Sequence, residues 1–273
     1  MFTTMLAPGV EDESIDLLSA ALVIARTVYP AIDIAKYAGC VESLAVRARG
    51  IMQDSTESAR IIDAVNRVLF QEEGFRGNRT DYYDPRNSYL NEVIDRKLGI
   101  PITLSVLYME VARRVGLPLF GVGMPGHFLL KFYDVDGHHL LIDAFEGGQV
   151  IHEGDCQARL DEIYAGQAPL EPEYLHSVGK RQILTRMLNN LKNIYLTSRN
   201  FRKALTVVDL ILAIYPRSPE DVKQRALLRY NLGQLKGSAN DFEDYLKMSP
   251  DASDVDDVRQ LALSIRRTMA SFN

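Results

Sequence analysis

Apolar residues recur at helical spacing through the first quarter of the chain, residues 13–70. The pattern predicts two amphipathic stripes on helices, and Pro30 is expected to end the first of them. The first stripe carries Leu17, Leu18, Ala21, Leu22 and Ala25, and the second carries Ile61, Ile62, Val65, Val68 and Leu69. We therefore expect a helical segment over residues 10–70.

A turn-rich segment follows, with the sequence GFRGNRTDYYDPR over residues 74–86. Gly, Asn, Asp and Pro favour turns, so we expect an ordered loop here. Asn87 or Ser88 can then cap a helix that carries Leu90, Val93 and Ile94, and Gly99 can close it.

The next helix is predicted to begin at Pro101, where the missing N–H costs nothing, and to end near Gly116. Its residues are apolar on most sides, which indicates a buried helix. Thr103 and Ser105 are polar exceptions. The ordinary interpretation is that their hydroxyls donate to backbone carbonyls one turn back.

Three strand-like runs come after this helix: LPLFGV, HFLLKFYDV and HHLLIDAF. Asp136 and Gly137 supply the hairpin residues between the last two. Helices first and a block of antiparallel strands second predict an α+β fold rather than a repeating βαβ fold.

From residue 185 the pattern changes to helical pairs with an internal period. Pro216 and Pro250 lie thirty-four residues apart, the repeat length of tetratricopeptide units. Other matching positions are Leu188, Leu191, Tyr195, Ala204, Ala226, Gly233 and Phe242, while Ser238 replaces the usual small alanine. We expect a short all-α array over residues 181–273, completed by a last helix at 253–270.

Composition narrows the class of protein without naming a reaction. The 273 residues are 47% hydrophobic and 25% charged, as in ordinary globular proteins, and the formal net charge is -5. This charge gives no reason to expect nucleic-acid binding. The chain shows neither a targeting segment nor an apolar stretch long enough for a bilayer, so we expect a cytoplasmic protein without membrane contact. Cys40 and Cys156 are expected to be buried thiols.

One His–Asp pair could carry chemistry. His127 follows a Pro-Gly turn at the start of a predicted strand, and Asp143 ends the next strand. A carboxylate that orients an imidazole makes it a general base, although a lone His beside a strand is more often structural. The pair requires a three-residue hairpin loop, Val135–Gly137, which places Asp143 opposite Leu129. A two-residue turn would separate the two side chains.

The turn-rich segment is the second candidate surface, because loops on a rigid scaffold often bind ligands. The alternative is that its polar side chains only satisfy the loop backbone and helix ends. The candidate ligand-binding residues are Asn78, Asp81, Tyr82, Tyr83, Asp84, Arg86, Asn87 and Asn91. We expect no metal site at His138 and His139, because adjacent strand residues point to opposite faces. No cofactor is expected either.

At these residues a family resemblance becomes specific. The stretch GIPITLSVLYMEVARRVGLP, followed by PGHFLLKFY and LLIDAF, resembles the helix, His strand and Asp strand of transglutaminase-like proteins. The longer segment from FQEEGFRGNRTDYY to PGHFLLKF is similar to the SirB-type family, in which this core precedes tetratricopeptide repeats. The resemblance covers nearly the whole chain. It implies a papain/transglutaminase-like domain over residues 1–180, with its core at 74–155, and a repeat domain over 181–273.

The chain departs from the superfamily at the nucleophile. In catalytic transglutaminase-like sequences a glycine, one residue and then the nucleophilic cysteine open the buried helix. Gly99, Ser105 and Gly116 match the family positions, but the cysteine position holds Pro101. Proline offers neither a nucleophile nor an N–H for an oxyanion site, so the cysteine-based acyl transfer cannot run. A rearranged set of Ser105, His127 and Asp143 is the remaining catalytic arrangement.

Three functions are compatible with this sequence. The first is an interaction or regulatory protein, a non-catalytic transglutaminase-like domain with repeats that bind a protein or peptide. The second is a hydrolase or acyltransferase that uses His127 and Asp143 with Ser105 or a substrate-supplied nucleophile. The third is a small-molecule sensor. The sequence names neither the partner nor the oligomeric state.

Overall fold

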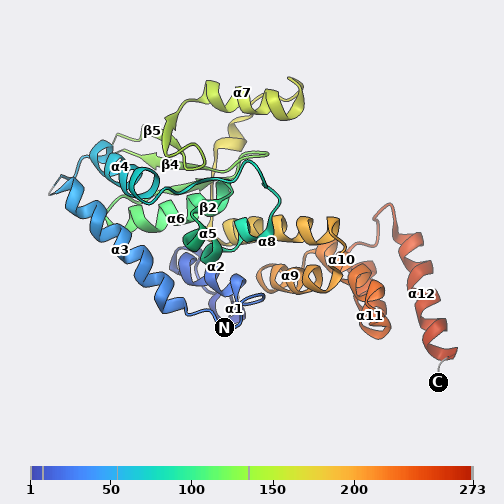
Figure 1. The fold of residues 1–273 in the computed structure, drawn as a ribbon. Coiled ribbons are helices and arrows are strands. Elements are labelled where there is room, and N and C mark those ends of the chain that lie inside the picture. Colours follow the sequence, from blue (N-terminus) through green and yellow to red (C-terminus); the bar gives the residue numbers. More distant parts are fainter. Residues whose placement is uncertain (1, 8, 54, 135, 272–273) are drawn as a thin grey trace. The chain divides into compact units, whose positions relative to one another are not determined.

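The computed structural model describes residues 2–7, 9–53, 55–134 and 136–271. It divides the chain into two compact units, one of residues Val10–Met187 and one of Met1–Gly9 with Leu188–Asn273. The division falls within helix α8 (Lys180–Thr197) (Figure 1).

The first unit begins with the helices that the apolar stripes predict. After a short 3-10 helix η1 (Asp12–Ser14) come α2 (Leu17–Ala25), α3 (Ile34–Met52) and α4 (Ser58–Asn66), and a π-helical turn η2 (Arg67–Glu72) extends α4. Asp16 caps α2 and Asp33 caps α3, each by accepting a backbone N–H three residues on. The second apolar stripe lies on α4 and η2, and its members Ile61, Val65 and Leu69 are buried.

The turn-rich loop leads into two short strands and a helix. β1 (Arg76–Gly77) pairs in parallel with β2 (Leu98–Gly99), and between them lie the 3-10 helix η3 (Pro85–Ser88) and α5 (Leu90–Arg96). Neither Asn87 nor Ser88 caps α5, because both belong to η3; the N-cap is Tyr89. Gly99 does not close α5 either, since Lys97 adopts the left-handed conformation there and Gly99 pairs with Gly77.

The buried helix α6 (Pro101–Arg114) starts at Pro101, as predicted, and most of its side chains are buried. The Thr103 hydroxyl donates to the carbonyl of Asn87 at 2.7 Å and lies 3.2 Å from that of Ile100. The expectation for Ser105 was wrong: its hydroxyl has no hydrogen-bond partner among the described residues.

The sheet of this unit has five antiparallel strands in the order β6-β5-β4-β3-β7. They are β3 (Phe120–Val122), β4 (Leu129–Tyr133), β5 (His139–Asp143), β6 (Gln149–Ile151) and β7 (Ser177–Val178). A further helix, α7 (Glu153–Tyr164), follows β6, and a 3-10 helix η4 (Pro172–Leu175) precedes β7. The α+β class is therefore confirmed.

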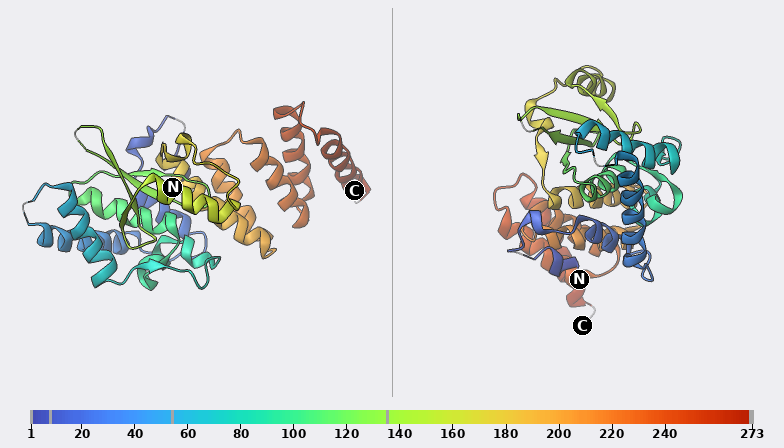
Figure 2. Two further views of the ribbon diagram at one scale, coloured as in Figure 1. Left: turned by 90° about the horizontal axis from the view of Figure 1, so that it is seen from above. Right: turned by 90° about the vertical axis from the view of Figure 1, so that its left-hand side faces the viewer.

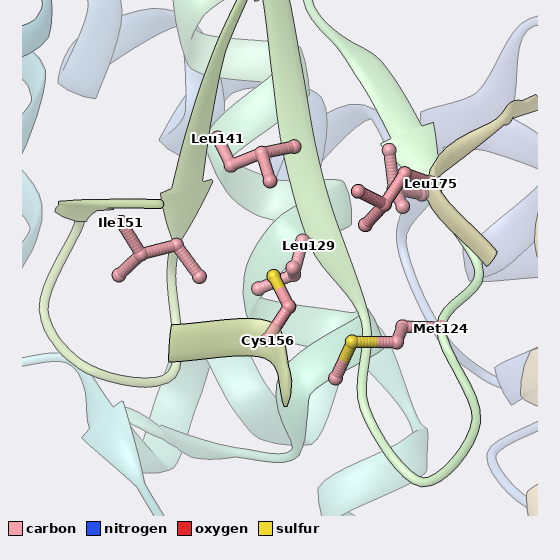
Figure 3. Packing of buried hydrophobic residues seen from close by; sticks show 7 residues of the cluster. Met124, Leu129, Leu141, Ile151, Cys156 and Leu175 are labelled. Carbon is pink, nitrogen blue, oxygen red and sulfur yellow. The ribbon is translucent and has the colours of Figure 1, made fainter. Parts of the chain in front are cut away.

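Two helices cover opposite faces of this sheet (Figure 1). Cys156 of α7 packs with Leu129 and Leu141 in a buried cluster that also holds Val122, Met124, Ile151 and Leu175 (Figure 3). Leu130 and Ile142 alternate with those residues along the strands and are fully buried on the other face, where α6 contacts β4. Side chains that share the face of Leu129 therefore point towards α7.

The second unit is a stack of helices, shown from two further sides in Figure 2. Its elements are α1 (Phe2–Met5), the end of α8, α9 (Phe201–Ile214), α10 (Pro219–Asn231), α11 (Leu235–Met248) and α12 (Val255–Ser271). Ser238, at the position that usually holds alanine, is fully buried and donates to the Ala226 carbonyl at 2.8 Å. Asp241 is buried between Arg225 and Arg229, each 2.7–2.8 Å from a carboxylate oxygen.

Within the described residues, no helix is both long enough and apolar enough to cross a lipid bilayer.

Candidate functional site

The hairpin of β4 and β5 brings His127 and Asp143 together. Tyr133 pairs with His139 and Leu130 with Ile142, the register in which Asp143 stands opposite Leu129. This is the register of the three-residue loop, and Gly137 adopts a positive φ of 84°; Val135, the first residue of that loop, lies outside the described residues. His127 Nε2 lies 2.9 Å from Asp143 Oδ2.

Both side chains are held firmly. Asp143 is fully buried, and its Oδ1 accepts the backbone N–H groups of Phe145 at 2.9 Å and Glu146 at 3.3 Å. His127 is also buried. Because Oδ1 is occupied by backbone donors, Oδ2 is the oxygen left to orient the imidazole.

Arg159 of α7 completes the cluster from the same face of the sheet. Its Nη2 lies 2.5 Å from Asp143 Oδ2 and 3.8 Å from Glu146 Oε1, and its Nη1 lies 3.3 Å from His127 Nε2. A guanidinium nitrogen is always a donor, so Arg159 cannot accept a proton from His127. Oδ2 of Asp143 thus contacts both the imidazole of His127 and the guanidinium of Arg159.

These charges fix the ionisation of Asp143. Burial opposes the charged form, but the hydrogen bond and charge of His127, the charge of Arg159 and the backbone N–H of Glu146 together hold the pKa of Asp143 below its ordinary value of 3.8. An ionised Asp143 accepts a hydrogen bond from Nε2–H, so we assign a proton to Nε2 in both the charged and the neutral imidazole. Nδ1 is then the basic nitrogen, and it makes no hydrogen bond within the part of the chain that the structure describes.

A tight turn positions His127. The backbone N–H of His127 donates to the carbonyl of Met124 at 3.2 Å, and Gly126 between them has a φ of +70°. Arg186 of α8 donates from Nη2 to the carbonyls of Met124 at 2.8 Å and His127 at 2.7 Å. Both ends of the turn are therefore tied to one side chain.

A row of aromatic rings leads from His127 to the surface. The centroids of His127 and Phe145 are 6.1 Å apart, those of Phe145 and Tyr82 6.3 Å, and those of Tyr82 and Tyr83 5.3 Å, all edge to face. The exposed fraction is 36% for Tyr82 and 76% for Tyr83. We call these four residues the ring row.

The ring row depends on a glycine in β1. A Cβ atom on Gly77 would lie 2.4 Å from the Phe145 ring, so only glycine lets that ring pack there. Gly77 pairs with Gly99, two residues before Pro101. The start of α6 and the His127 site are thus linked through Phe145.

The structure splits the eight predicted ligand-binding residues into two groups. Asn78, Asp84, Asn87 and Asn91 are buried, and two of them form an internal network: Asn78 Nδ2 donates to Asn87 Oδ1, and Asn87 Nδ2 donates to the Asp81 carbonyl at 2.7 Å. Asp84 pairs with Arg86 and Arg96. Asn78, Asp84 and Asn87 are thus bonded within the loop and to α5, whereas Asn91 Oδ1 makes no hydrogen bond with the described residues. Asp81, Tyr82, Tyr83 and Arg86 remain exposed.

Ser105 is not brought to His127. It is fully buried on α6, and its Oγ makes no hydrogen bond with any residue in the described ranges. His127 and Asp143 share the face of Leu129, whereas α6 covers the opposite face. The rearranged triad is therefore not formed in this structure.

Two other features lie apart from the dyad. Asp134, Asp136 and His138 present oxygen and nitrogen atoms within 4.8 Å of one another at the hairpin tip, but all are exposed, and Asp134 Oδ1 already accepts the backbone N–H groups of residues 136 and 138. A hollow of about 250 Å³ is lined by Leu17, Met109 and Phe120 among others, and none of the predicted site residues lines it.

Sequence reasoning missed Arg159 and Arg186. Each contacts His127 from a helix more than thirty residues away in the chain, and neither belongs to a local motif. A single arginine on an amphipathic helix gives no signal of its own until the helix is placed.

Comparisons with known proteins agree with this architecture. Residues 35–189 match the sequence profile of the transglutaminase-like superfamily, and residues 191–262 match a tetratricopeptide repeat profile. The chain is 40% identical over 253 residues to a UPF0162 protein of Xylella fastidiosa (strain Temecula1), covering 92% of this chain and 90% of that protein.

A UPF0162 protein of Vibrio cholerae is 29% identical over 200 residues, 73% of each chain. F-box only protein 21 of Mus musculus is 34% identical over 193 residues, which are 67% of this chain and 30% of that protein. No solved structure matches the chain.

Proposed function

The chain belongs to the UPF0162 family and carries a transglutaminase-like core followed by tetratricopeptide repeats, and from that premise we propose that it is a protein-interaction or regulatory module without the cysteine chemistry of its superfamily. One observation carries the proposal. Pro101 is the first residue of α6, the position where the family resemblance expects the nucleophilic cysteine. Without a thiol or a backbone N–H at this point, acyl transfer lacks its first step.

The retained His127–Asp143 pair has a structural use that needs no reaction. Asp143 joins the hairpin, the loop at Phe145 and Glu146, and Arg159 of α7. Removal of any partner would leave a buried charge uncompensated. The His127–Asp143 pair therefore stabilises the fold of a protein that binds a partner without catalysing a reaction.

The repeats supply the partner-binding part of the proposal. Repeat arrays of this kind present extended surfaces to peptides and proteins. Tyr230 of α10 and Leu263 of α12 are both 45% exposed, and aromatic side chains are frequent anchors in interfaces.

The test combines capture and turnover. Affinity capture with the wild-type chain, His127→Ala and Tyr230→Ala, followed by mass spectrometry, is expected to recover one partner with the first two and to lose it with the third. A panel of p-nitrophenyl esters and anilides is expected to be hydrolysed no faster by the wild type than by His127→Ala. If His127→Ala keeps the partner but abolishes a real turnover, the binding-only function is wrong.

A second function draws support from one observation. Asp143 orients the imidazole of His127 through Nε2. The Nδ1 atom of His127 makes no hydrogen bond in the described structure, and an oriented imidazole with one free nitrogen is the arrangement of a general base. A hydrolase or acyltransferase would then need a nucleophile from the substrate, since Ser105 makes no contact with His127. Turnover of thiol- or hydroxyl-bearing acyl substrates that disappears in His127→Ala would establish it.

A further inference from the structure

Arg186 is a partly buried cation without a counter-charge. Its Nη2 atom donates to two backbone carbonyls, and its aliphatic stem carries the guanidinium to 5.6 Å from the Phe128 ring centroid. No carboxylate in the described ranges pairs with it, and its Nε and Nη1 groups make no hydrogen bond there. Burial lowers the pKa of Arg186, and no carboxylate opposes this effect.

The neighbouring arginines differ from it. Arg159 pairs with Asp143 and Glu146, and Arg79 pairs with Glu146 while lying over the Phe145 ring. The surroundings of His127 therefore hold three arginines but two carboxylates, Asp143 and Glu146, and both carboxylates are paired with Arg159 or Arg79. The excess positive charge is that of Arg186.

Tyr82 of the ring row belongs to the same surroundings of His127: Arg186 donates to the His127 carbonyl, and the Phe145 ring contacts the rings of both His127 and Tyr82. Burial and Tyr83 raise the pKa of Tyr82, whereas the positive charge of Arg186 lowers it. Tyr82 in turn raises the pKa of Arg186, against the effect of burial. The Tyr82 hydroxyl makes no hydrogen bond in the described structure, so it too has a free donor.

From this geometry we propose that Arg186 and the Tyr82 hydroxyl bind an anionic side chain, a carboxylate or a phosphate, of a peptide whose flanking residues pack on Tyr82 and Tyr83. A guanidinium withdrawn from water gains most from an anion, because charge-assisted hydrogen bonds are the strong ones. The exposed rings add sequence-tolerant apolar contact. This site lies in the unit Val10–Met187, so the proposal goes beyond partner binding by the repeats and names the chemistry of a second ligand.

The probes are four fluorescein-labelled hexapeptide libraries, each acetylated and amidated, with one fixed central residue: glutamate, phosphoserine, glutamine or lysine. Fluorescence polarisation with the full chain measures their affinities. We expect the glutamate or the phosphoserine library to bind about ten-fold more tightly than the glutamine library, as one charged hydrogen-bonded contact would give. The ratio between the two anionic libraries distinguishes carboxylate from phosphate.

Variants locate the site. Arg186→Gln is expected to abolish the preference for the anionic libraries, and Tyr82→Phe, which keeps the ring, to weaken it about three-fold. Arg79→Gln is the matched control and is expected to keep the preference. Because Arg186 also ties the His127 turn, Arg186→Lys is included: it keeps the charge and is expected to retain part of the preference.

Several outcomes would overturn the anion site: equal binding of the glutamate and glutamine libraries, tighter binding of the lysine library, no binding of any library, or an unchanged preference in Arg186→Gln. Mass spectrometry of the peptides after incubation separates the two proposals. Peptides that the wild type modifies and His127→Ala does not would contradict the non-catalytic function and leave the anion site standing.

Discussion

At the scale of single residues, the two oxygens of Asp143 have different tasks. Oδ1 takes backbone N–H groups from the loop that follows β5, and Oδ2 takes His127 and Arg159. One carboxylate therefore fixes both the loop that carries Phe145 and the orientation of the imidazole. Its ionisation should govern the stability of the whole hairpin.

Replacement of Asp143 by asparagine is expected to lower the free energy of unfolding by about 3 kcal/mol at pH 7, because Arg159 would lose its buried anion. The pH dependence has a definite sign. The native pKa of Asp143 lies below the unfolded value, so its contribution is fully present above about pH 4 and is lost as the pH falls through the native pKa.

Urea denaturation between pH 3 and pH 7 measures both effects. The wild type should lose more stability than Asp143→Asn on acidification, so the two curves converge at low pH. Asp81→Asn, which changes an exposed carboxylate in the same unit, is the control and should follow the wild type. Parallel curves for wild type and Asp143→Asn would contradict the assignment.

Pro101 offers a gain-of-function prediction. Phe145 links the His127 site to Gly77, and Gly77 pairs with Gly99 beside Pro101. A cysteine placed there by Pro101→Cys is expected to react with iodoacetamide more than about ten-fold faster than one introduced by Ser105→Cys. Both positions are buried, but the family resemblance places the first beside the imidazole, which promotes the thiolate.

The comparison uses chains in which Cys40 and Cys156 are replaced by serine and alanine, so that only the new thiol is alkylated. Adding His127→Ala to Pro101→Cys should slow the reaction. Equal rates with and without His127 would mean that the imidazole no longer serves the position where the family places its nucleophile.

Residue types in the sequence predicted the dyad, but not the groups around it. His127 and Asp143 stand out because they flank a hairpin whose length sets their register. Arg159 and Arg186 contact the same histidine only because α7 and α8 fold back onto it. Asn78 and Asn87 resemble surface ligands in sequence, yet they bond to each other inside the loop.

At the scale of elements, the turn from Met124 to His127 decides where the imidazole stands. Gly126 has a positive φ, and a Cβ atom there would lie 2.3 Å from Ile163 of α7. Any other residue at position 126 would have a strained backbone and would collide with the Ile163 side chain. Ile163 of α7 therefore packs against the turn in the space that a side chain at position 126 would occupy.

Gly126→Ala is expected to lower the free energy of unfolding by about 1–3 kcal/mol, since alanine must adopt a left-handed conformation and displace Ile163. Gly154→Ala is the matched control: Gly154 lies on α7, has open space around it and should become neutral or slightly more stable as alanine. Thermal and urea denaturation give the values. A loss in Gly154→Ala as large as in Gly126→Ala would contradict this explanation.

Helix periodicity predicted most elements, and tertiary pairing explains where it did not. Pro101 begins α6 as the sequence indicates. The end of α5 shifts to Lys97 because Leu98 and Gly99 are drawn into a parallel pair with β1, a contact that no local propensity encodes. α7 was not foreseen, since it has only Cys156 and Leu160 as buried residues.

At the scale of the whole molecule, the first unit is closed by a contact between residues far apart in the chain. Asp12 accepts the backbone N–H of Lys180 through Oδ2 and that of Arg181 through Oδ1 at 2.9 Å. The start of the unit thereby caps the first turn of α8, where Gln182 also accepts the Gly179 N–H at 2.9 Å. Gly179 permits the approach, because a Cβ atom there would lie 2.5 Å from Asp12 Oδ2.

Asp12→Ala is expected to lower the free energy of unfolding by about 1–2 kcal/mol, the loss that follows when a helix N-terminus is deprived of its acceptor. Glu13→Ala removes the adjacent carboxylate, which takes no part in the contact, and should leave stability unchanged. Hydrogen exchange should quicken at Lys180 and Arg181 in the first variant and not in the second. If exchange at α8 is the same in both, the N-terminal segment does not hold this helix, and closure of the unit must come from apolar packing around Leu17 and Ile183 alone.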